Sequence, residues 1–115
     1  MPLITSSDPT DTLSVKNSDA DYLIFYSSVD ASNRMWCPDC RRVEDFVRSS
    51  FEADDAPKAL IVYVGQREAW KGRADNPYRG TPWNVNSVPT IIKKEGARLV
   101  DDEITEDSLK SFIKA

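Results

Sequence analysis

The sequence predicts an α/β domain in which helices cover both faces of a central mixed β-sheet. Two observations predict it. Compact runs of β-branched and aromatic residues alternate with segments whose apolar residues recur at the helical period. The last two strand-like runs, 90–94 and 97–100, are separated only by Glu95-Gly96, which is typical of an antiparallel hairpin. Strands joined through helices and followed by a hairpin give a mixed sheet.

The first half of the chain predicts two strands and two helices. Leu3-Ile4-Thr5 is typical of a short edge strand, and Asp8-Pro9 of an N-cap followed by proline at the start of a short helix. The apolar run Tyr22–Tyr26 predicts a buried strand, and the polar stretch 27–34 predicts a loop. A longer amphipathic helix then begins at Pro38, because proline suits the first helical turn. Its apolar stripe comprises Cys40, Val43, Phe46, Val47 and Phe51.

The second half begins with another buried strand over residues 59–64. Residues 65–87 form a connection too long for a bare loop, so one or two short helices are expected there. The hairpin follows, and Thr105 is a suitable N-cap for a final helix with Glu106 and Asp107 in its first turn. The apolar face of that helix would contain Leu109, Phe112 and Ile113.

Length and composition indicate one domain over residues 1–115, with a short strand and helix in the first twenty residues. The net charge of −4 argues against nucleic-acid binding, which depends on Lys and Arg. The longest apolar run is far too short to span a membrane, and residues 1–7 lack the features of a secretory signal. We therefore expect a cytoplasmic monomer with neither nucleic-acid nor membrane partners.

The chain has two cysteines, in the sequence Cys37-Pro38-Asp39-Cys40. In a reducing compartment such a pair is more often catalytic or metal-binding than structural. The helix N-terminus stabilises a thiolate at Cys37, which is expected to be the exposed nucleophile. Cys40, one helical turn later and facing inward, would be the resolving thiol. Asp39, a carboxylate close to both sulfurs, should oppose thiolate formation.

Other interpretations of the pair fit less well. Structural zinc needs four Cys or His ligands, and this chain has no histidine, so no metal site is expected without a second chain. Haem attachment needs histidine directly after the second cysteine, and Arg41 stands there. Hydrolysis by a Cys–His pair is excluded because the chain has no histidine. Two cysteines buried as small hydrophobic residues would suit Cys40 but not an exposed Cys37.

Several stretches resemble known thioredoxins. Trp36 and the Cys-Pro-Asp-Cys sequence precede an amphipathic helix, and Val88-Pro89-Thr90 enters a later strand. Three further stretches resemble the thioredoxin domain-containing protein 17 family: Val64-Gly65, Trp70-Lys71 and Asn76-Pro77-Tyr78-Arg79. The resemblance covers residues 21–115 and implies the thioredoxin fold.

The resemblance also implies site residues. Cys37 would be the nucleophile and Cys40 the resolving cysteine, with Pro89 as a cis-proline lying against their disulfide. The substrate-facing surface would comprise Trp36, Pro38, Asp39 and the Val88 backbone. Thioredoxins carry a buried Asp in the strand before the cysteines, but Tyr22–Tyr26 contains no acid. Asp39 or water would therefore assist deprotonation of Cys40.

The expected function is disulfide reduction without a bound cofactor, through a redox-active Cys37–Cys40 disulfide. By resemblance, the substrates would be small disulfides such as cystine or selected protein disulfides. Electrons would come from NADPH through thioredoxin reductase, the expected protein partner. Two alternatives stay open: a redox-sensing module that binds a protein partner, and a glutaredoxin-like reductase that depends on glutathione. The second is less favoured because Asp39 replaces the usual neutral or aromatic residue between the cysteines.

Overall fold

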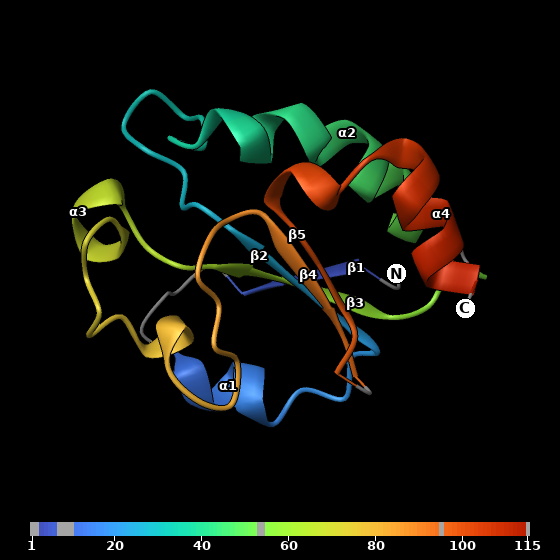
Figure 1. Ribbon diagram of the computed structural model, residues 1–115, viewed down its shortest axis with the longest axis horizontal. Helices are drawn as coiled ribbons and strands as arrows, with labels where there is room; N and C mark the ends of the chain where they lie inside the picture. The colour runs from blue at the N-terminus through green and yellow to red at the C-terminus, as the bar shows by residue number, and fades with distance from the viewer. Residues whose placement is uncertain (1–2, 7–10, 53–54, 95, 115) are drawn as a thin grey trace.

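A computed structural model describes residues 3–6, 11–52, 55–94 and 96–114. Its centre is a five-stranded sheet in the order β1-β3-β2-β4-β5 (Figure 1). The strands are β1 (Leu3–Ser6), β2 (Tyr22–Tyr26), β3 (Ala59–Tyr63), β4 (Thr90–Lys93) and β5 (Arg98–Val100). The strands β1, β3 and β2 are parallel, whereas β4 runs antiparallel to both β2 and β5. The predicted mixed sheet, edge strand and hairpin are confirmed; Glu95, in the predicted turn, lies outside the described residues.

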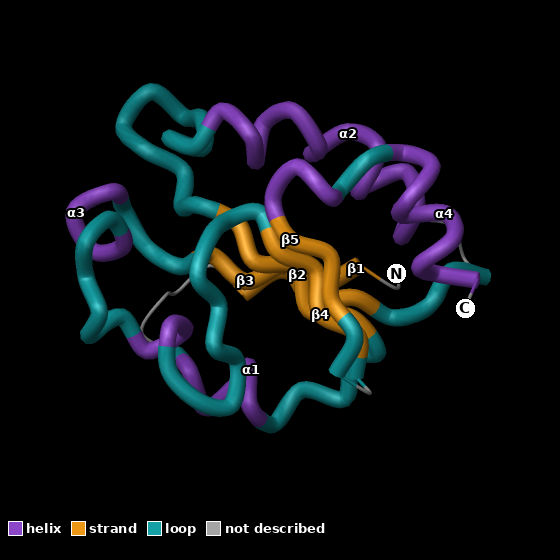
Figure 2. Tube along the Cα trace, in the orientation of Figure 1, coloured by secondary structure: helices purple, strands orange, loops and turns teal. Residues whose placement is uncertain are grey.

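Helices cover both faces of this sheet, as the sequence predicts. On one side lie α2 (Pro38–Glu52) and α4 (Glu106–Lys114), and on the other lies α1 (Thr12–Lys16) (Figure 2). The helix α2 begins at Pro38 and buries Cys40, Val43, Val47 and Phe51. This is the predicted stripe except for Phe46, which is only partly buried. In the part of the chain that the structure describes, no helix is long and apolar enough to cross a membrane.

The predicted short helix in the first twenty residues is present as α1. The expected start at Asp8-Pro9 lies outside the described residues, and Asp11 is the N-cap of α1, accepting a hydrogen bond from Ser14 N. In this register Val15 is buried, whereas Leu13 is 65% exposed. The final helix follows the prediction, because Thr105 Oγ1 accepts from Ser108 N at its start. A 3-10 turn η2 (Asp101–Glu103), which the sequence did not predict, precedes it.

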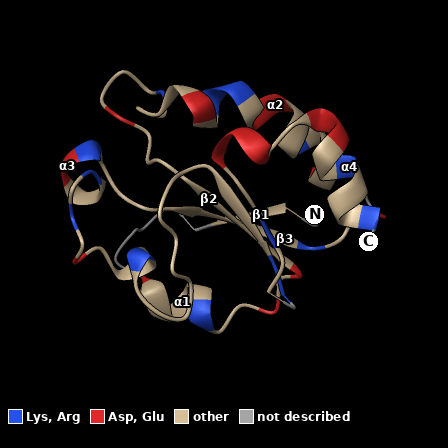
Figure 3. Ribbon diagram, in the orientation of Figure 1, with Lys and Arg blue, Asp and Glu red and all other residues tan. Residues whose placement is uncertain are grey.

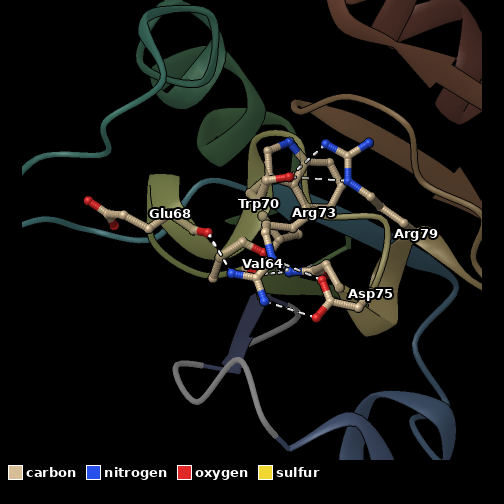
Figure 4. A network of polar contacts seen from close by, with 8 residues as sticks. Val64, Glu68, Trp70, Arg73, Asp75 and Arg79 are labelled. Atoms are coloured by element: carbon tan, nitrogen blue, oxygen red, sulfur yellow. Dashed lines mark hydrogen bonds and ion pairs between the residues drawn. The ribbon is translucent and has the colours of Figure 1, made fainter.

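The segment between β3 and β4 contains the two short helices that its length predicts, α3 (Arg67–Trp70) and η1 (Pro77–Arg79). The Arg79 guanidinium lies 3.9 Å from the centre of the Trp70 ring and donates to Trp70 O (Figure 4). Next to it, Arg73 forms an ion pair with Asp75 at 2.9 Å. Trp70 and Trp83 are both buried and pack this segment onto the core of the fold.

Asn76 fastens the same segment to the sheet. Its side-chain Nδ2 donates to Val64 O and to Ala69 O, each at 2.9 Å, and its Oδ1 accepts from Tyr78 N at 3.0 Å. Asn76 is buried, so water cannot replace these bonds easily. One side chain therefore connects the end of β3, the helix α3 and the turn η1.

Candidate active site

The two cysteines lie where the loop after β2 enters α2. Ser27, the residue that follows β2, contacts both of them. Its Oγ accepts a hydrogen bond from Cys37 N at 3.1 Å, and its N–H donates to Cys40 Sγ at 3.4 Å. Both cysteines are free thiols in this structure. Ser27 was not among the predicted site residues, although a serine next to the strand that lacks the buried acid was a usable signal.

The predicted exposure of Cys37 is wrong. Cys37 is 8% exposed and Cys40 is 0% exposed, so both are buried and differ only in degree. The cause is a neighbour from a distant part of the chain: Val88 O lies 3.6 Å from Cys37 Sγ and accepts a hydrogen bond from it when Cys37 is protonated. A helix N-terminus is open to solvent by default, but here the segment before β4 covers it.

Pro89 and Val88 lie beside the cysteines. The Val88–Pro89 peptide bond is cis, and both residues are buried. Pro89 O accepts from Asp101 N at 2.8 Å, which connects the segment before β4 to η2. A second cis bond, Thr81–Pro82, occurs earlier in the same connection and was not predicted.

The other predicted substrate-facing residues lie near the two cysteines. Trp36 is half-buried, and its indole Nε1 donates to Gly65 O at 3.0 Å. Pro38 and Asp39 are exposed in the first turn of α2. The structure therefore brings all the predicted site residues to one end of the sheet.

The two thiols have different acidities. The pKa of Cys37 falls to about 6, first because Cys40 hydrogen-bonds to its sulfur and then because backbone N–H groups of α2 point at it. Desolvation and the negative charge of Asp39 oppose this shift, as the sequence predicts for Asp39. The pKa of Cys40 is raised, first by burial and then by Cys37. Near neutral pH the pair therefore holds one thiolate, on Cys37.

A pair of carboxyl groups lies next to the cysteines. The carboxyl group of Asp39 faces that of Asp101, and the pKa of Asp101 is raised by burial and by repulsion from Asp39. The buried Asp101 Oδ1 has no hydrogen-bond donor among the described residues. Arg42 contacts both residues: its Nε lies 3.9 Å from Asp39 Oδ1, and its Nη2 donates to the backbone O of Asp101. Figure 3 shows the acidic turn η2 beside α2. Asp101 was not among the predicted site residues, because it lies far from the cysteines in the sequence and meets Asp39 only in the fold.

Comparison with known proteins agrees with this geometry. A family model described as thioredoxin domain-containing protein 17-like, thioredoxin domain, matches residues 6–114. The chain belongs to this family. Its mixed five-stranded sheet between helices is accordingly an α/β thioredoxin fold, as the sequence predicts. Family membership together with the Cys37–Cys40 pair supports a redox role.

Three relatives show how similar the chain is to other members. It is 38% identical to thioredoxin-like protein Clot of Oryza sativa subsp. japonica, over 70% of this chain and 66% of that protein. It is 30% identical to thioredoxin domain-containing protein 17 of Homo sapiens, over 84% of this chain and 79% of that protein. The identity to the Mus musculus protein of that name is 28%, over 80% of this chain and 75% of that protein.

Replacing Asp39 with asparagine is expected to lower the Cys37 pKa in this family member below its value of about 6. The reason is that the carboxylate repels the thiolate, whereas the amide does not. The pH dependence of iodoacetamide alkylation measures this, and the midpoint should fall by roughly half a unit for an exposed charge. Asp45→Asn, an exposed position on the same helix, is the control. A midpoint that stays or rises would contradict the prediction.

Replacing Asp101 with asparagine is expected to stabilise the protein at neutral pH. The pKa of Asp101 is higher in the folded state than in the unfolded state, so ionisation of this carboxyl group favours unfolding. Its contribution to stability therefore falls as the pH rises. Asn also tolerates the φ of 52° at this position. The melting temperature should rise by about 2 °C at pH 7, as expected for a partly exposed pair. The gain should vanish below the ordinary pKa of 3.8. Asp102→Asn, exposed in the same turn, is the control, and a pH-independent gain would contradict the assignment.

Proposed function

We propose that this protein is a thiol–disulfide oxidoreductase that reduces small or selected protein disulfides. The observation that carries the proposal is the difference between the two thiols. Cys37 has a pKa of about 6 and lies at the start of α2, whereas Cys40 is fully buried with a raised pKa. A thiolate attacks disulfides at neutral pH, and a second thiol one helical turn away can then displace the product.

The reaction takes two steps. In the first, the Cys37 thiolate attacks a substrate disulfide, forms a mixed disulfide and releases one thiolate. In the second, Cys40 loses its proton to water and attacks Cys37 Sγ, which releases the second thiolate and leaves a Cys37–Cys40 disulfide. Two electrons thus pass from the dithiol to the substrate. We propose that thioredoxin reductase returns the disulfide to the dithiol with electrons from NADPH, in the cytoplasm.

Features around the cysteines support a restricted range of substrates. Cys37 is covered by the Val88 carbonyl, so large or rigid disulfides have limited access to its sulfur. The exposed carboxylate of Asp39 repels acidic surfaces. Trp36 and the segment 65–87 would together border the path by which a substrate reaches Cys37, since Trp36 is hydrogen-bonded to Gly65. Small disulfides such as cystine should therefore reach Cys37 more easily than disulfides on an acidic protein surface.

A coupled assay tests the proposal. The protein is mixed with NADPH, thioredoxin reductase and cystine, and NADPH consumption is followed by absorbance. Steady consumption that disappears in Cys37→Ser is expected. One stoichiometric turnover or none would overturn the proposal in favour of a redox-gated binding module. Turnover that instead requires glutathione and glutathione reductase would indicate a glutaredoxin-like enzyme.

A further inference from the structure

The second step of the reaction has to proceed without a carboxylate in contact with Cys40 among the described residues. Cys40 must become a thiolate, yet it is fully buried and its pKa is raised by that burial. The preceding strand β2 contains no acid. Asp39, which the sequence analysis suggested for this task, is exposed on α2 and repels a thiolate. With 0% exposure the Cys40 sulfur is not hydrated, so the charge that remains once water takes its proton needs hydrogen-bond donors from the protein.

Ser27 is the group that meets this sulfur. It is fully buried at the end of β2, and its N–H donates to Cys40 Sγ at 3.4 Å. Its Oγ accepts from Cys37 N at 3.1 Å, which leaves the hydroxyl proton free to donate. Because the Oγ has no access to solvent, that proton needs an acceptor within the protein, and Cys40 Sγ is within reach.

We propose that Ser27 is a further catalytic residue, whose hydroxyl and backbone N–H together stabilise the Cys40 thiolate in the second step. This inference rests on the proposed function. In the resting dithiol, the Cys40 S–H donates to the Cys37 thiolate. Once Cys37 is in a mixed disulfide, that acceptor is lost, the Cys40 proton passes to water, and the two Ser27 donors face the sulfur as its charge develops. Ser27 thereby takes the place of a buried carboxylate, but as a hydrogen-bond donor rather than as a base.

Single-turnover kinetics separate the two steps. Reduced protein is mixed with dithiodipyridine, which releases one equivalent of thiopyridone when Cys37 attacks and a second when Cys40 resolves the mixed disulfide. In Ser27→Ala the second phase is expected to be about tenfold slower, because the variant loses one hydrogen bond to the charged sulfur. The pH midpoint of the second phase should move upward, because a donor to the thiolate is lost. The first phase should change by less than about twofold, as Ser27 makes no bond to the Cys37 sulfur.

Two further variants keep the test decisive. Ser28→Ala is the matched control, since Ser28 is also buried and its Oγ also accepts a backbone N–H, from Gly65 at 3.0 Å, away from the cysteines. Its second phase should match that of the wild type. Ser27→Thr retains the hydroxyl and should retain a fast second phase, which covers the case in which Ser27→Ala does not fold.

The possible failures are distinguishable. A wild-type protein that releases only one equivalent would overturn the proposed function itself. A wild type with both phases, combined with an unchanged second phase in Ser27→Ala, would overturn the role of Ser27 alone. Equal slowing in Ser27→Ala and Ser28→Ala would also overturn it, because the effect would then come from loosened packing. A slow second phase in folded Ser27→Thr would have the same meaning.

Discussion

Replacing Cys40 with serine is expected to reduce turnover by about a thousandfold or more and to trap substrate on Cys37 as a mixed disulfide. The reason is that a serine hydroxyl cannot displace the product thiol, whereas the Cys37 thiolate can still carry out the first attack. The serine hydroxyl can still donate to the Cys37 thiolate in place of the Cys40 thiol, so the Cys37 pKa should stay low. Mass spectrometry after incubation with cystine should find one added half-cystine.

Cys37→Ser is the matched variant for this experiment. It should be equally inactive, but it should trap little substrate, because Cys40 is fully buried and protonated at neutral pH. Trapping through Cys40 in Cys37→Ser, combined with none through Cys37 in Cys40→Ser, would reverse the roles of the two cysteines. Equal trapping in both variants would mean that burial does not separate the thiols.

Replacing Asn76 with alanine is expected to destabilise the protein by about 3 kcal/mol and to lower its melting temperature by roughly 10–15 °C. The side chain makes three buried hydrogen bonds, to Val64 O, to Ala69 O and from Tyr78 N, and alanine leaves all three partners unsatisfied. Because β3, α3 and η1 meet at this residue, the loss should loosen the segment 65–87 as a unit. Urea unfolding and thermal melting measure the change.

Asn86→Ala is the control for this prediction. Asn86 lies in the same segment and is exposed. Its backbone carbonyl accepts a hydrogen bond from Arg79, and this bond remains after the substitution. Its melting temperature should therefore change by less than about 2 °C. Similar small shifts in both variants would contradict the role assigned to Asn76.

Local patterns in the sequence predicted most of the fold. The alternation of apolar runs and helix-period segments located the strands, and the helical period from Pro38 to Phe51 placed Cys40 on the buried stripe of α2. These predictions succeeded because they depend on neighbours within one or two turns or along one strand. The predicted start of the first helix, Asp8-Pro9, lies outside the described residues, and the N-cap that the structure shows for α1 is Asp11.

The candidate site shows the limit of local information. The strand–helix boundary and the spacing of the cysteines predicted a nucleophile and a resolving thiol from the sequence alone. Their surroundings come from elsewhere in the chain: Val88 from the segment before β4, Asp101 from the turn after β5, and Ser27 from the end of β2.

The Cys37–Cys40 pair, its place at a helix start and its inward-facing second thiol were thus determined by the sequence itself. The burial of Cys37, the carboxyl pair with Asp101 and the hydrogen bonds of Ser27 were decided only by the tertiary structure. The physical reason is the range of the interactions. Helical period and capping act between residues a few positions apart, whereas the solvent exposure and pKa of a thiol depend on every segment that the sheet order brings against it.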